Sequence, residues 1–258
     1  MLERIGERLR AYAQKDGRGY PDWALRYAPI VRKLRRRMHR RARIIEIGTN
    51  ENGFARFARR RVIAVDIDRD HLQAARAAQD VLAVLADMCA LPFAAGCADL
   101  CICVDTLEHV PPEKRSAALN EIARVIRESG IAVAAFPAGA AAVSAEQTVQ
   151  TAYRKYVGRS LAWLDEHRQH GLPDPRAVVQ TFKTAVGNTH RVFQFGNAPV
   201  WLWRWMWRIL LCGWPGRGNA LFQALLRAIT PLLTRIRFGT CYRTVIWVEP
   251  KKKDVERT

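Results

Sequence analysis

The sequence predicts an α/β fold, in which helices cover both faces of a mainly parallel, doubly wound β-sheet. Two observations support this prediction. Short, continuous apolar runs recur along the chain, at 43–47, 62–66, 81–85, 100–104 and 131–136. Stretches with helical spacing of apolar residues lie between them, at 54–60, 69–79 and 114–127. Strands that are apolar on both faces are typical of parallel sheets buried between helices.

The composition is that of a folded globular protein rather than a disordered one. Of the 258 residues, 49% are hydrophobic and 26% are charged. No run of about 18 uncharged apolar residues occurs, so no membrane-spanning helix is predicted. Residues 1–10 are charged and lack the apolar segment of a signal peptide, so a cytoplasmic location is expected. The six cysteines form no CxxC pair, which favours small buried thiols over a zinc site or disulfides.

The formal net charge of +18 has two explanations. Arginine supplies most of the basic residues and the chain is also rich in alanine, a combination typical of a GC-rich coding sequence. A nucleic acid or an anionic membrane surface would also attract such a chain. The sequence alone does not decide between them.

The first 42 residues are predicted to form a basic helical arm, interrupted at 17–21. A dense basic run from Lys33 to Arg41 closes this segment. Such a run is either a solvated helix face or an electrostatic patch for an anionic partner. Residues 43–139 contain the five apolar runs and form the predicted core.

Beyond the core, residues 140–187 are expected to form a helical cap and one helix of the fold, and 188–250 to hold two strands with a Trp-rich helical insertion at 197–237. Gly and Pro residues set the expected boundaries. The predicted elements are, in order, a helix at 144–169, a break at 171–175, a helix from Pro175 to about Lys183, a strand at 190–195, helices at 198–212 and 218–236 separated by a break at 213–218, a strand at 241–249 and a charged tail at 251–258.

A candidate ligand site lies where the first two predicted strands end. The first strand runs into a turn at Gly48, and the second ends at Asp66. In parallel sheets, ligands bind at the carboxyl ends of the strands. Gly48 lets the backbone approach a ligand, and a carboxylate at Asp66 can accept both hydroxyls of a ribose. The G-x-G-x-x-G pattern of dinucleotide binding is absent, so the sequence does not favour NAD.

Five segments, in order, resemble class I S-adenosylmethionine-dependent methyltransferases of the type 11 kind. They are the loop motif Glu46-Ile-Gly48-Thr-Asn50-Glu-Asn52-Gly53, Asp66 at the second strand end, Asp87 followed by Leu-Pro-Phe93, the stretch Asp105-Thr-Leu-Glu-His109-Val, and residues 121–130. The resemblance covers about 43–139. Asn50 and Asn52 replace two glycines of the family's loop, and asparagine adopts left-handed backbone more readily than most residues.

This resemblance implies a Rossmann-like, doubly wound, mainly parallel seven-stranded sheet with an antiparallel last strand and a helical cap. The five parallel strands are expected in the order 3-2-1-4-5, followed by the strands at 190–195 and 241–249. The implied cofactor is S-adenosyl-L-methionine. The resemblance assigns residues to each part of this cofactor. Glu46 fixes the loop and reaches the amino group of the methionine portion, and Gly48, Thr49 and Asn50 form the loop itself. Asp66 holds the ribose, Ile67, Asp87 and the Met88 N–H contact the adenine, and Asp105 and Thr106 lie beneath the methyl group.

The acceptor side of the site is less defined. His109 is the candidate general base by its place in the motif, since histidine titrates near neutrality; packing under the following Pro-Pro turn is the alternative. His167 and His170 lie three residues apart on one predicted helix face, and with Trp201 they are candidates to line an acceptor pocket. Metal binding by these histidines would require further ligands, and the sequence identifies none.

The sequence therefore predicts an enzyme that transfers a methyl group from S-adenosylmethionine to a small-molecule or lipid-linked acceptor by in-line displacement. Two alternatives are a nucleic-acid methyltransferase, suggested by the charge, and a non-catalytic cofactor-binding protein, suggested by Asn50 and Asn52. Against the first, residues 136–139 read Phe-Pro-Ala-Gly, where base-amino methylases carry Asn/Asp-Pro-Pro-aromatic. The insertion at 197–237 is predicted to cover the acceptor site, and its basic amphipathic helices can lie on an anionic membrane surface, placing the protein peripherally on the inner face. The oligomeric state is not predicted.

Overall fold

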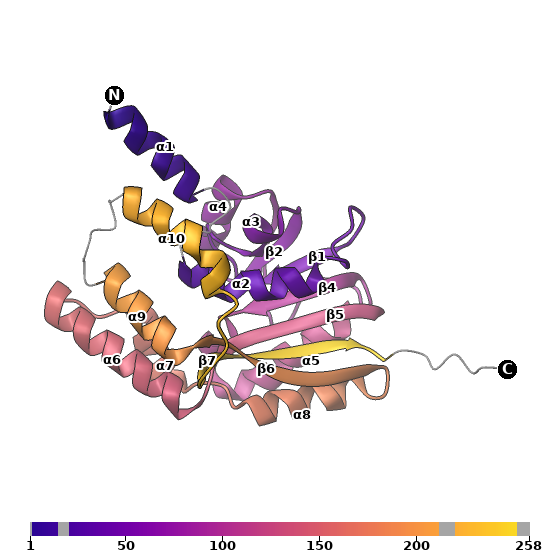
Figure 1. Ribbon diagram of the computed structural model, residues 1–258. Coiled ribbons are helices and arrows are strands. Elements are labelled where there is room, and N and C mark those ends of the chain that lie inside the picture. The colour runs from indigo at the N-terminus through magenta and orange to yellow at the C-terminus, as the bar shows by residue number, and fades with distance from the viewer. Residues whose placement is uncertain (1, 15–20, 212–219, 252–258) are drawn as a thin grey trace.

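A computed structural model of the protein describes residues 2–14, 21–211 and 220–251. Within these residues, seven strands form one sheet in the order β3-β2-β1-β4-β5-β7-β6 (Figure 1). The strands are β1 Ile44–Ile47, β2 Val62–Asp66, β3 Val81–Leu85, β4 Ala98–Val104, β5 Ile126–Pro137, β6 His190–Pro199 and β7 Cys241–Pro250. Strands β1 to β5 run parallel, and β7 lies antiparallel between β5 and β6. The predicted Rossmann-like fold, strand order and antiparallel last strand are confirmed.

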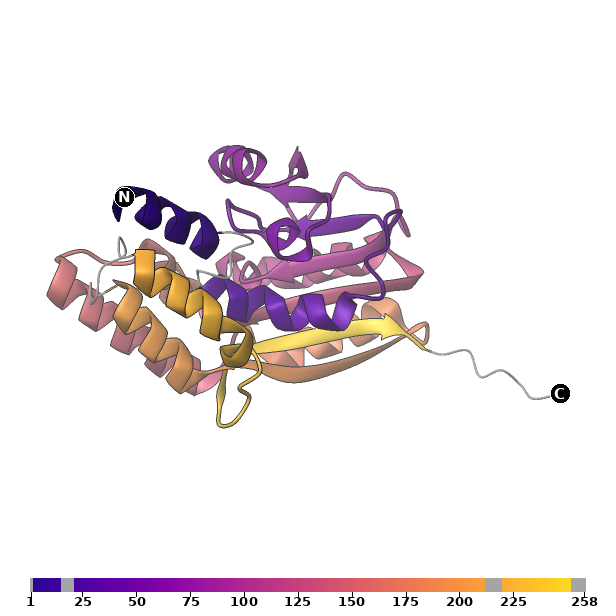
Figure 2. The ribbon, with the colours of Figure 1, turned by 45° about the horizontal axis from the view of Figure 1, so that its top comes forward.

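Helices cover both faces of this sheet, as continuous apolar strands require. The described helices are α1 Leu2–Gln14, α2 Pro21–Leu34, α3 Phe54–Ala58, α4 Arg69–Ala78, α5 Arg115–Val125, α6 Gly139–Val157, α7 Ala162–His170, α8 Pro175–Val186, α9 Val200–Leu211 and α10 Ala220–Leu233, with short 3₁₀ helices η2 Leu107–His109 and η3 Pro112–Lys114. Helices α5 and α8 bury apolar residues against one face of the sheet. Helices α2 and α3 cover the opposite face (Figures 1 and 2).

Helix α2 belongs to the core, although the sequence predicts that its residues lie in a basic arm. Its side chains at Leu25, Ile30 and Leu34 are almost fully buried, so it packs as a structural layer of the domain. The basic run begins with Lys33 in the last turn of α2 and continues beyond the helix, where Arg35 and Arg36 are exposed to solvent. Helix α1 lies beside α10 (Figure 2). The apolar face of α2, rather than the charges that follow it, decides where this segment packs.

The helix expected over 144–169 is wrong, because the structure divides it into α6 and α7. Gly158 ends α6 in a left-handed conformation with φ of 73°, which glycine adopts without steric cost. The side chain of Gln150 holds the turn by accepting a hydrogen bond from the Leu161 N–H at 2.9 Å. As a result α7 folds back and packs on η2, next to the carboxyl end of β4.

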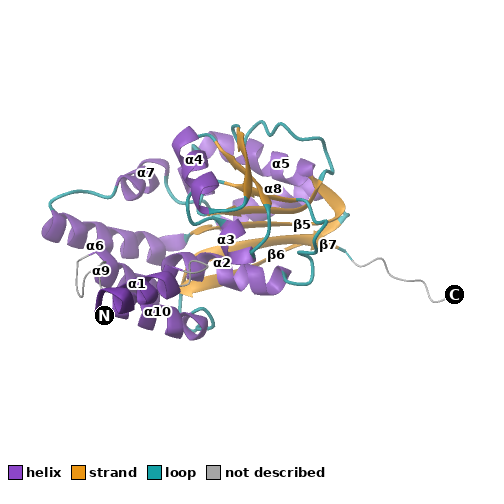
Figure 3. Ribbon diagram, turned by 90° about the horizontal axis from the view of Figure 1, so that it is seen from above, coloured by secondary structure: helices purple, strands orange, loops and turns teal. Residues whose placement is uncertain are grey.

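The segment between β6 and β7 contributes α9 and α10, and β6 extends to Pro199, beyond the expected start of the insertion at 197. Helix α9 packs on α6, whereas α10 packs on α1 and α2. Figure 3 shows α6, α9 and α10 together beyond one end of the strands. The predicted break at 213–218, together with residues 252–258 of the tail, falls outside the described residues. None of the described helices is long and apolar enough to cross a membrane.

Candidate active site

The turn after β1 requires glycine at position 48. Its φ is 73°, and a Cβ atom at this position would lie only 1.9 Å from Thr106 Oγ1. The Gly48 N–H donates to the carbonyl of Val65 at 2.9 Å, and the Thr49 N–H donates to Asp66 Oδ2 at 2.9 Å. These bonds connect the loop after β1 to the end of β2. The loop is therefore fixed against the residue expected to hold the ribose.

Glu46 lies buried beneath this loop, with 1% of its surface exposed. Its Oε1 accepts hydrogen bonds from the Phe54 N–H at 2.5 Å, where α3 begins, and from the Tyr27 hydroxyl at 3.3 Å. Burial raises the pKa of Glu46 to about 7, although the hydrogen bonds from Phe54 and Tyr27 oppose this shift. Of the roles expected for Glu46, these hydrogen bonds account for one, which is to hold the loop after β1 in place.

The two asparagines of the loop do not use the left-handed backbone that asparagine tolerates. Neither has a positive φ. Instead the Asn50 side chain accepts from the Asn52 N–H at 2.9 Å, and Asn52 Oδ1 accepts from Arg56 at 2.9 Å. The carbonyl of Asn50 accepts from the Gln79 side chain at 2.6 Å. The amide side chains therefore brace the loop through hydrogen bonds that glycine could not make.

A cavity of about 190 Å³ opens at the carboxyl ends of the parallel strands. Of the residues expected to bind the cofactor or act in catalysis, it is lined by Gly48, Asp66, Ile67, Asp87, Met88, Thr106 and His109. Asp66 also accepts from the Asp68 N–H at 2.8 Å, which orients its carboxylate. Ile67 is 72% exposed, so its side chain is free to flank a flat ring. Thr49 and Asn50 belong to the same loop but do not line the cavity.

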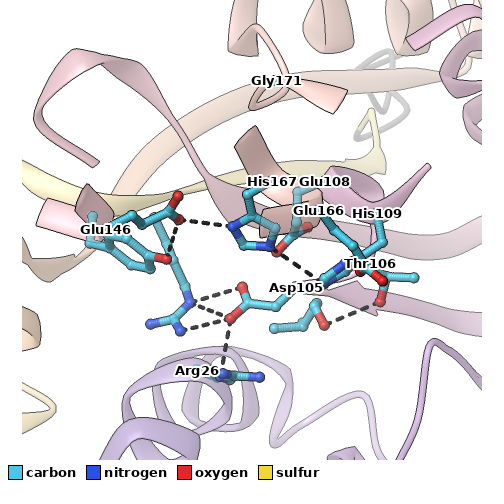
Figure 4. A network of polar contacts seen from close by, with 12 residues as sticks. Arg26, Asp105, Thr106, Glu108, His109, Glu146, Glu166, His167 and Gly171 are labelled. Atoms are coloured by element: carbon cyan, nitrogen blue, oxygen red, sulfur yellow. Dashed lines mark hydrogen bonds and ion pairs between the residues drawn. The ribbon is translucent and has the colours of Figure 1, made fainter. Parts of the chain in front are cut away.

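Asp105 does not reach this cavity, although we expected it beneath the methyl group. Its backbone adopts a positive φ of 50°, and its carboxylate pairs with Arg243 at 2.7 Å and Arg26 at 3.0 Å (Figure 4). Arg243 is 1% exposed and also contacts Asp22. Burial opposes ionisation here, but the two guanidinium groups hold the pKa of Asp105 below its ordinary value. Asp105 therefore fastens α2 and β7 to the end of β4.

Two histidines meet beside the cavity, joined by a chain of polar contacts (Figure 4). His109 Nδ1 lies 2.6 Å from Glu166 Oε2, and His167 Nδ1 lies 2.9 Å from Glu146 Oε1. The two Nε2 atoms are 3.4 Å apart. Burial, with the nearby His167, lowers the pKa of His109. The Tyr242 hydroxyl donates to Glu146 Oε1 at 2.6 Å and extends the chain to β7.

A second cavity, of about 320 Å³, lies between α6 and α7. His167 lines it together with Glu146 and Gln150. His170, on the same helix, does not line either of the two cavities. Trp201 also lies outside both; it is 44% exposed and stacks on Phe238 with ring centroids 5.3 Å apart. Of the three candidates for the acceptor pocket, the structure brings only His167 to a cavity beside His109.

The residues that hold this site together through ion pairs and hydrogen bonds are not among those predicted from the sequence. Arg26 and Arg243 come from α2 and β7, and Glu146 comes from α6. Nothing in the local sequence marks them, because their partners lie far away along the chain. Only Glu108 and Glu166 adjoin histidines in the sequence, and that adjacency is the one signal of their role.

Comparison with known proteins agrees with this geometry. Residues 45–134 match the model of a family described as a methyltransferase domain. A chain in the complex between the Haloferax volcanii Trm112 methyltransferase activator and a putative methyltransferase is 16% identical, with a TM-score of 0.56, over 93% of this chain and 96% of that chain. A putative sarcosine dimethylglycine methyltransferase from Galdieria sulphuraria is 16% identical, with a TM-score of 0.54, over 89% and 84%.

A third solved structure, an S-adenosylmethionine-dependent methyltransferase of Thermotoga maritima described as a possible histamine N-methyltransferase, is 12% identical, with a TM-score of 0.54, over 89% of this chain and 92% of that chain. No curated protein sequence matches the chain. At these identities the likeness to solved structures shows the fold. Together with the match of residues 45–134 to a methyltransferase domain, this fold supports a class I S-adenosylmethionine-dependent methyltransferase. The chain is a methyltransferase, and S-adenosylmethionine is its cofactor.

Proposed function

We propose that this methyltransferase acts on a small-molecule or lipid-linked acceptor that reaches the methyl group from the side of α6 and α7. The observation that carries this proposal is the histidine pair, because His109 lines the strand-end cavity and His167 lines the cavity between α6 and α7. With the cofactor in the first cavity, an acceptor in the second would approach past these two side chains.

In this proposal, Asp66 holds the ribose, Asp87 and Ile67 hold the adenine, and Gly48 lets the methionine portion pass over the loop. A sulfonium methyl group is already activated, so the chain mainly has to align the acceptor with it. His109 and His167 act on the acceptor side, where a hydroxyl or amine acceptor has to be oriented and relieved of a proton.

A lipid-linked acceptor is supported by an apolar surface on α10. Leu221, Leu225, Ile229 and Leu232 follow one another at helical spacing and are between 41% and 66% exposed. Exposed basic residues, Arg235 and Arg237, follow the helix. A helix with an apolar stripe and flanking arginines can lie in the interface of an anionic bilayer without crossing it. We therefore assign membrane contact to the insertion at 197–237.

One experiment distinguishes the classes of acceptor. The protein is incubated with methyl-labelled S-adenosylmethionine and a cell extract, and the label is measured after separation into lipid, small-molecule, nucleic-acid and protein fractions. Label in the lipid or small-molecule fraction is expected. Label confined to nucleic acid would contradict the proposal, and no cofactor binding by calorimetry would contradict the cofactor assignments.

A vesicle assay tests the membrane contact separately. The double variant Leu225→Asp/Ile229→Asp places two charges on the apolar stripe of α10 and should reduce co-sedimentation with anionic vesicles by at least about tenfold, since each buried charge is costly. Val157→Asp, at another exposed apolar position, is the matched control and should bind like the parent protein. Equal binding of both variants, or no binding of the parent protein at low salt, would contradict membrane contact through α10.

A further inference from the structure

The contact between His109 and His167 is unfavourable when both rings are neutral and carry their protons on Nδ1. Both Nδ1 atoms face carboxylates, Glu166 at 2.6 Å and Glu146 at 2.9 Å. When each Nδ1 donates its proton to its carboxylate, each Nε2 carries a lone pair. These two Nε2 atoms are 3.4 Å apart. Two lone pairs at this separation repel each other, so the arrangement favours a positive charge shared by both nitrogens.

A buried carboxyl group that makes no hydrogen bond to another described residue lies beside the two histidines. Glu108 is fully buried, and neither of its side-chain oxygens makes a hydrogen bond to another described residue. Its Oε1 lies 3.9 Å from His167 Nε2. Donor atoms of Glu108, His109 and His167 all lie within 4.8 Å of one another. A buried carboxyl group without a hydrogen bond is costly, so its retention here indicates an additional ligand.

We propose that Glu108, His109 and His167 bind a divalent transition-metal ion. Two imidazole nitrogens held about 2.0–2.1 Å from a tetrahedral metal ion are about 3.3–3.4 Å apart. The observed separation of 3.4 Å already has this value. Two imidazoles and one carboxylate suit Zn²⁺ or Fe²⁺ and leave positions open, whereas Mg²⁺ and Ca²⁺ prefer oxygen ligands alone.

The carboxylates behind the histidines support the same assignment. A histidine that binds a metal through one ring nitrogen commonly donates the other N–H to a carboxylate, which fixes the tautomer and the orientation of the ring. Glu166 stands in this position for His109, and Glu146 for His167 (Figure 4). Glu146 is itself held by the hydroxyl of Tyr242. A shared proton would need only the two imidazoles and would leave Glu108 without a partner.

An ion at this location could take part in binding the acceptor, and this part of the inference rests on the proposed function. The ion would lie between the strand-end cavity and the cavity between α6 and α7, since His109 lines the first and His167 the second. Its open positions could hold an oxygen or nitrogen atom of the acceptor and so orient it toward the methyl group. His109 would then act as a metal ligand rather than as a free base.

The test measures metal binding directly on the full chain without an affinity tag. The protein is treated with a chelator and desalted, and Zn²⁺ binding is followed by calorimetry, with the bound metal counted by elemental analysis after dialysis. One equivalent of Zn²⁺ is expected. His109→Gln and Glu108→Gln should weaken the affinity by at least about 100-fold, and Glu146→Gln by about 10–100-fold, as loss of a supporting carboxylate does.

His170→Gln is the matched control, because it removes a histidine of α7 that does not face the cluster; it should bind Zn²⁺ like the parent protein. His109 is only partly buried, so its variant should fold even if replacing the buried His167 destabilises the chain. Absence of Zn²⁺ binding in the parent protein, as a shared proton would give, overturns the inference, and so does equal affinity in His109→Gln. Cofactor affinity, measured on Glu108→Gln and Glu146→Gln, whose side chains do not line the strand-end cavity, should change less than about threefold, so a failure of the cofactor assignment is seen separately.

Discussion

Replacing the buried carboxyl group beneath the cofactor loop should change how stability depends on pH. Glu46 has a pKa raised to about 7 from the ordinary value of 4.5, chiefly because burial penalises the charged form. When the chain unfolds, this group returns to its ordinary pKa. Between these two pH values, the unfolded state releases a proton that the folded state keeps. Stability is therefore lost as pH rises from about 4.5 to about 7.

The size of this loss follows from the two pKa values. Each pH unit by which they differ corresponds to about 1.4 kcal/mol, so the free energy of unfolding should fall by up to about 3 kcal/mol across the interval. Glu46→Gln keeps an oxygen that can accept from the Phe54 N–H but removes the titration. Relative to the parent protein, the variant should therefore become more stable as pH rises, and the difference in the free energy of unfolding should level off above about pH 7.

Urea denaturation of both proteins between about pH 4 and pH 8 measures this difference, because the other titrating groups are common to both and cancel. Glu51→Gln, at an exposed position of the same loop, is the control and should follow the parent curve within about 0.5 kcal/mol at every pH. Parallel curves for the parent protein and Glu46→Gln would refute the reasoning. They would mean that Glu46 ionises with the same ease in the folded and unfolded chain.

Three further substitutions test other parts of the site. Asp66→Ala should weaken S-adenosylmethionine binding by about 1.5–3 kcal/mol, the range for hydrogen bonds to charged groups, and unchanged affinity in calorimetry with an intact fold would contradict the ribose assignment. Gly48→Ala should lower cofactor affinity at least about tenfold, because the added methyl group meets Thr106 at 1.9 Å and the backbone is left-handed; binding like that of the parent protein would show that the loop adjusts. Arg243→Met should destabilise the fold by about 3–5 kcal/mol, because it removes one partner of a buried ion pair and leaves Asp105 with Arg26, and a loss below about 1 kcal/mol in urea denaturation would show that Arg26 alone compensates.

The sequence determined the sheet and the residues at the ends of its strands, because both depend on local patterns. Continuous apolar runs that alternate with helical segments favour the strands of a helix-covered sheet, and the residue that ends such a strand lies at the carboxyl edge of the sheet. For that reason the sequence alone predicts that Gly48, Asp66 and Asp87 lie at one edge of the sheet, and in the folded chain all three line the same cavity.

Only the tertiary structure shows which residues lie together on the acceptor side of the site. The sequence places His167 and His170 in one long predicted helix. In the structure the left-handed Gly158 ends the first helix, and α7 folds back. His167 therefore contacts His109, 58 residues away along the chain, whereas His170 lines neither of the two cavities. By its motif, Asp105 is expected beneath the methyl group of the cofactor, yet its carboxylate pairs with arginines of α2 and β7. Ion pairs and histidine contacts between distant segments depend on how helices pack over the sheet, and helix packing is set by the shapes of buried faces rather than by any short motif.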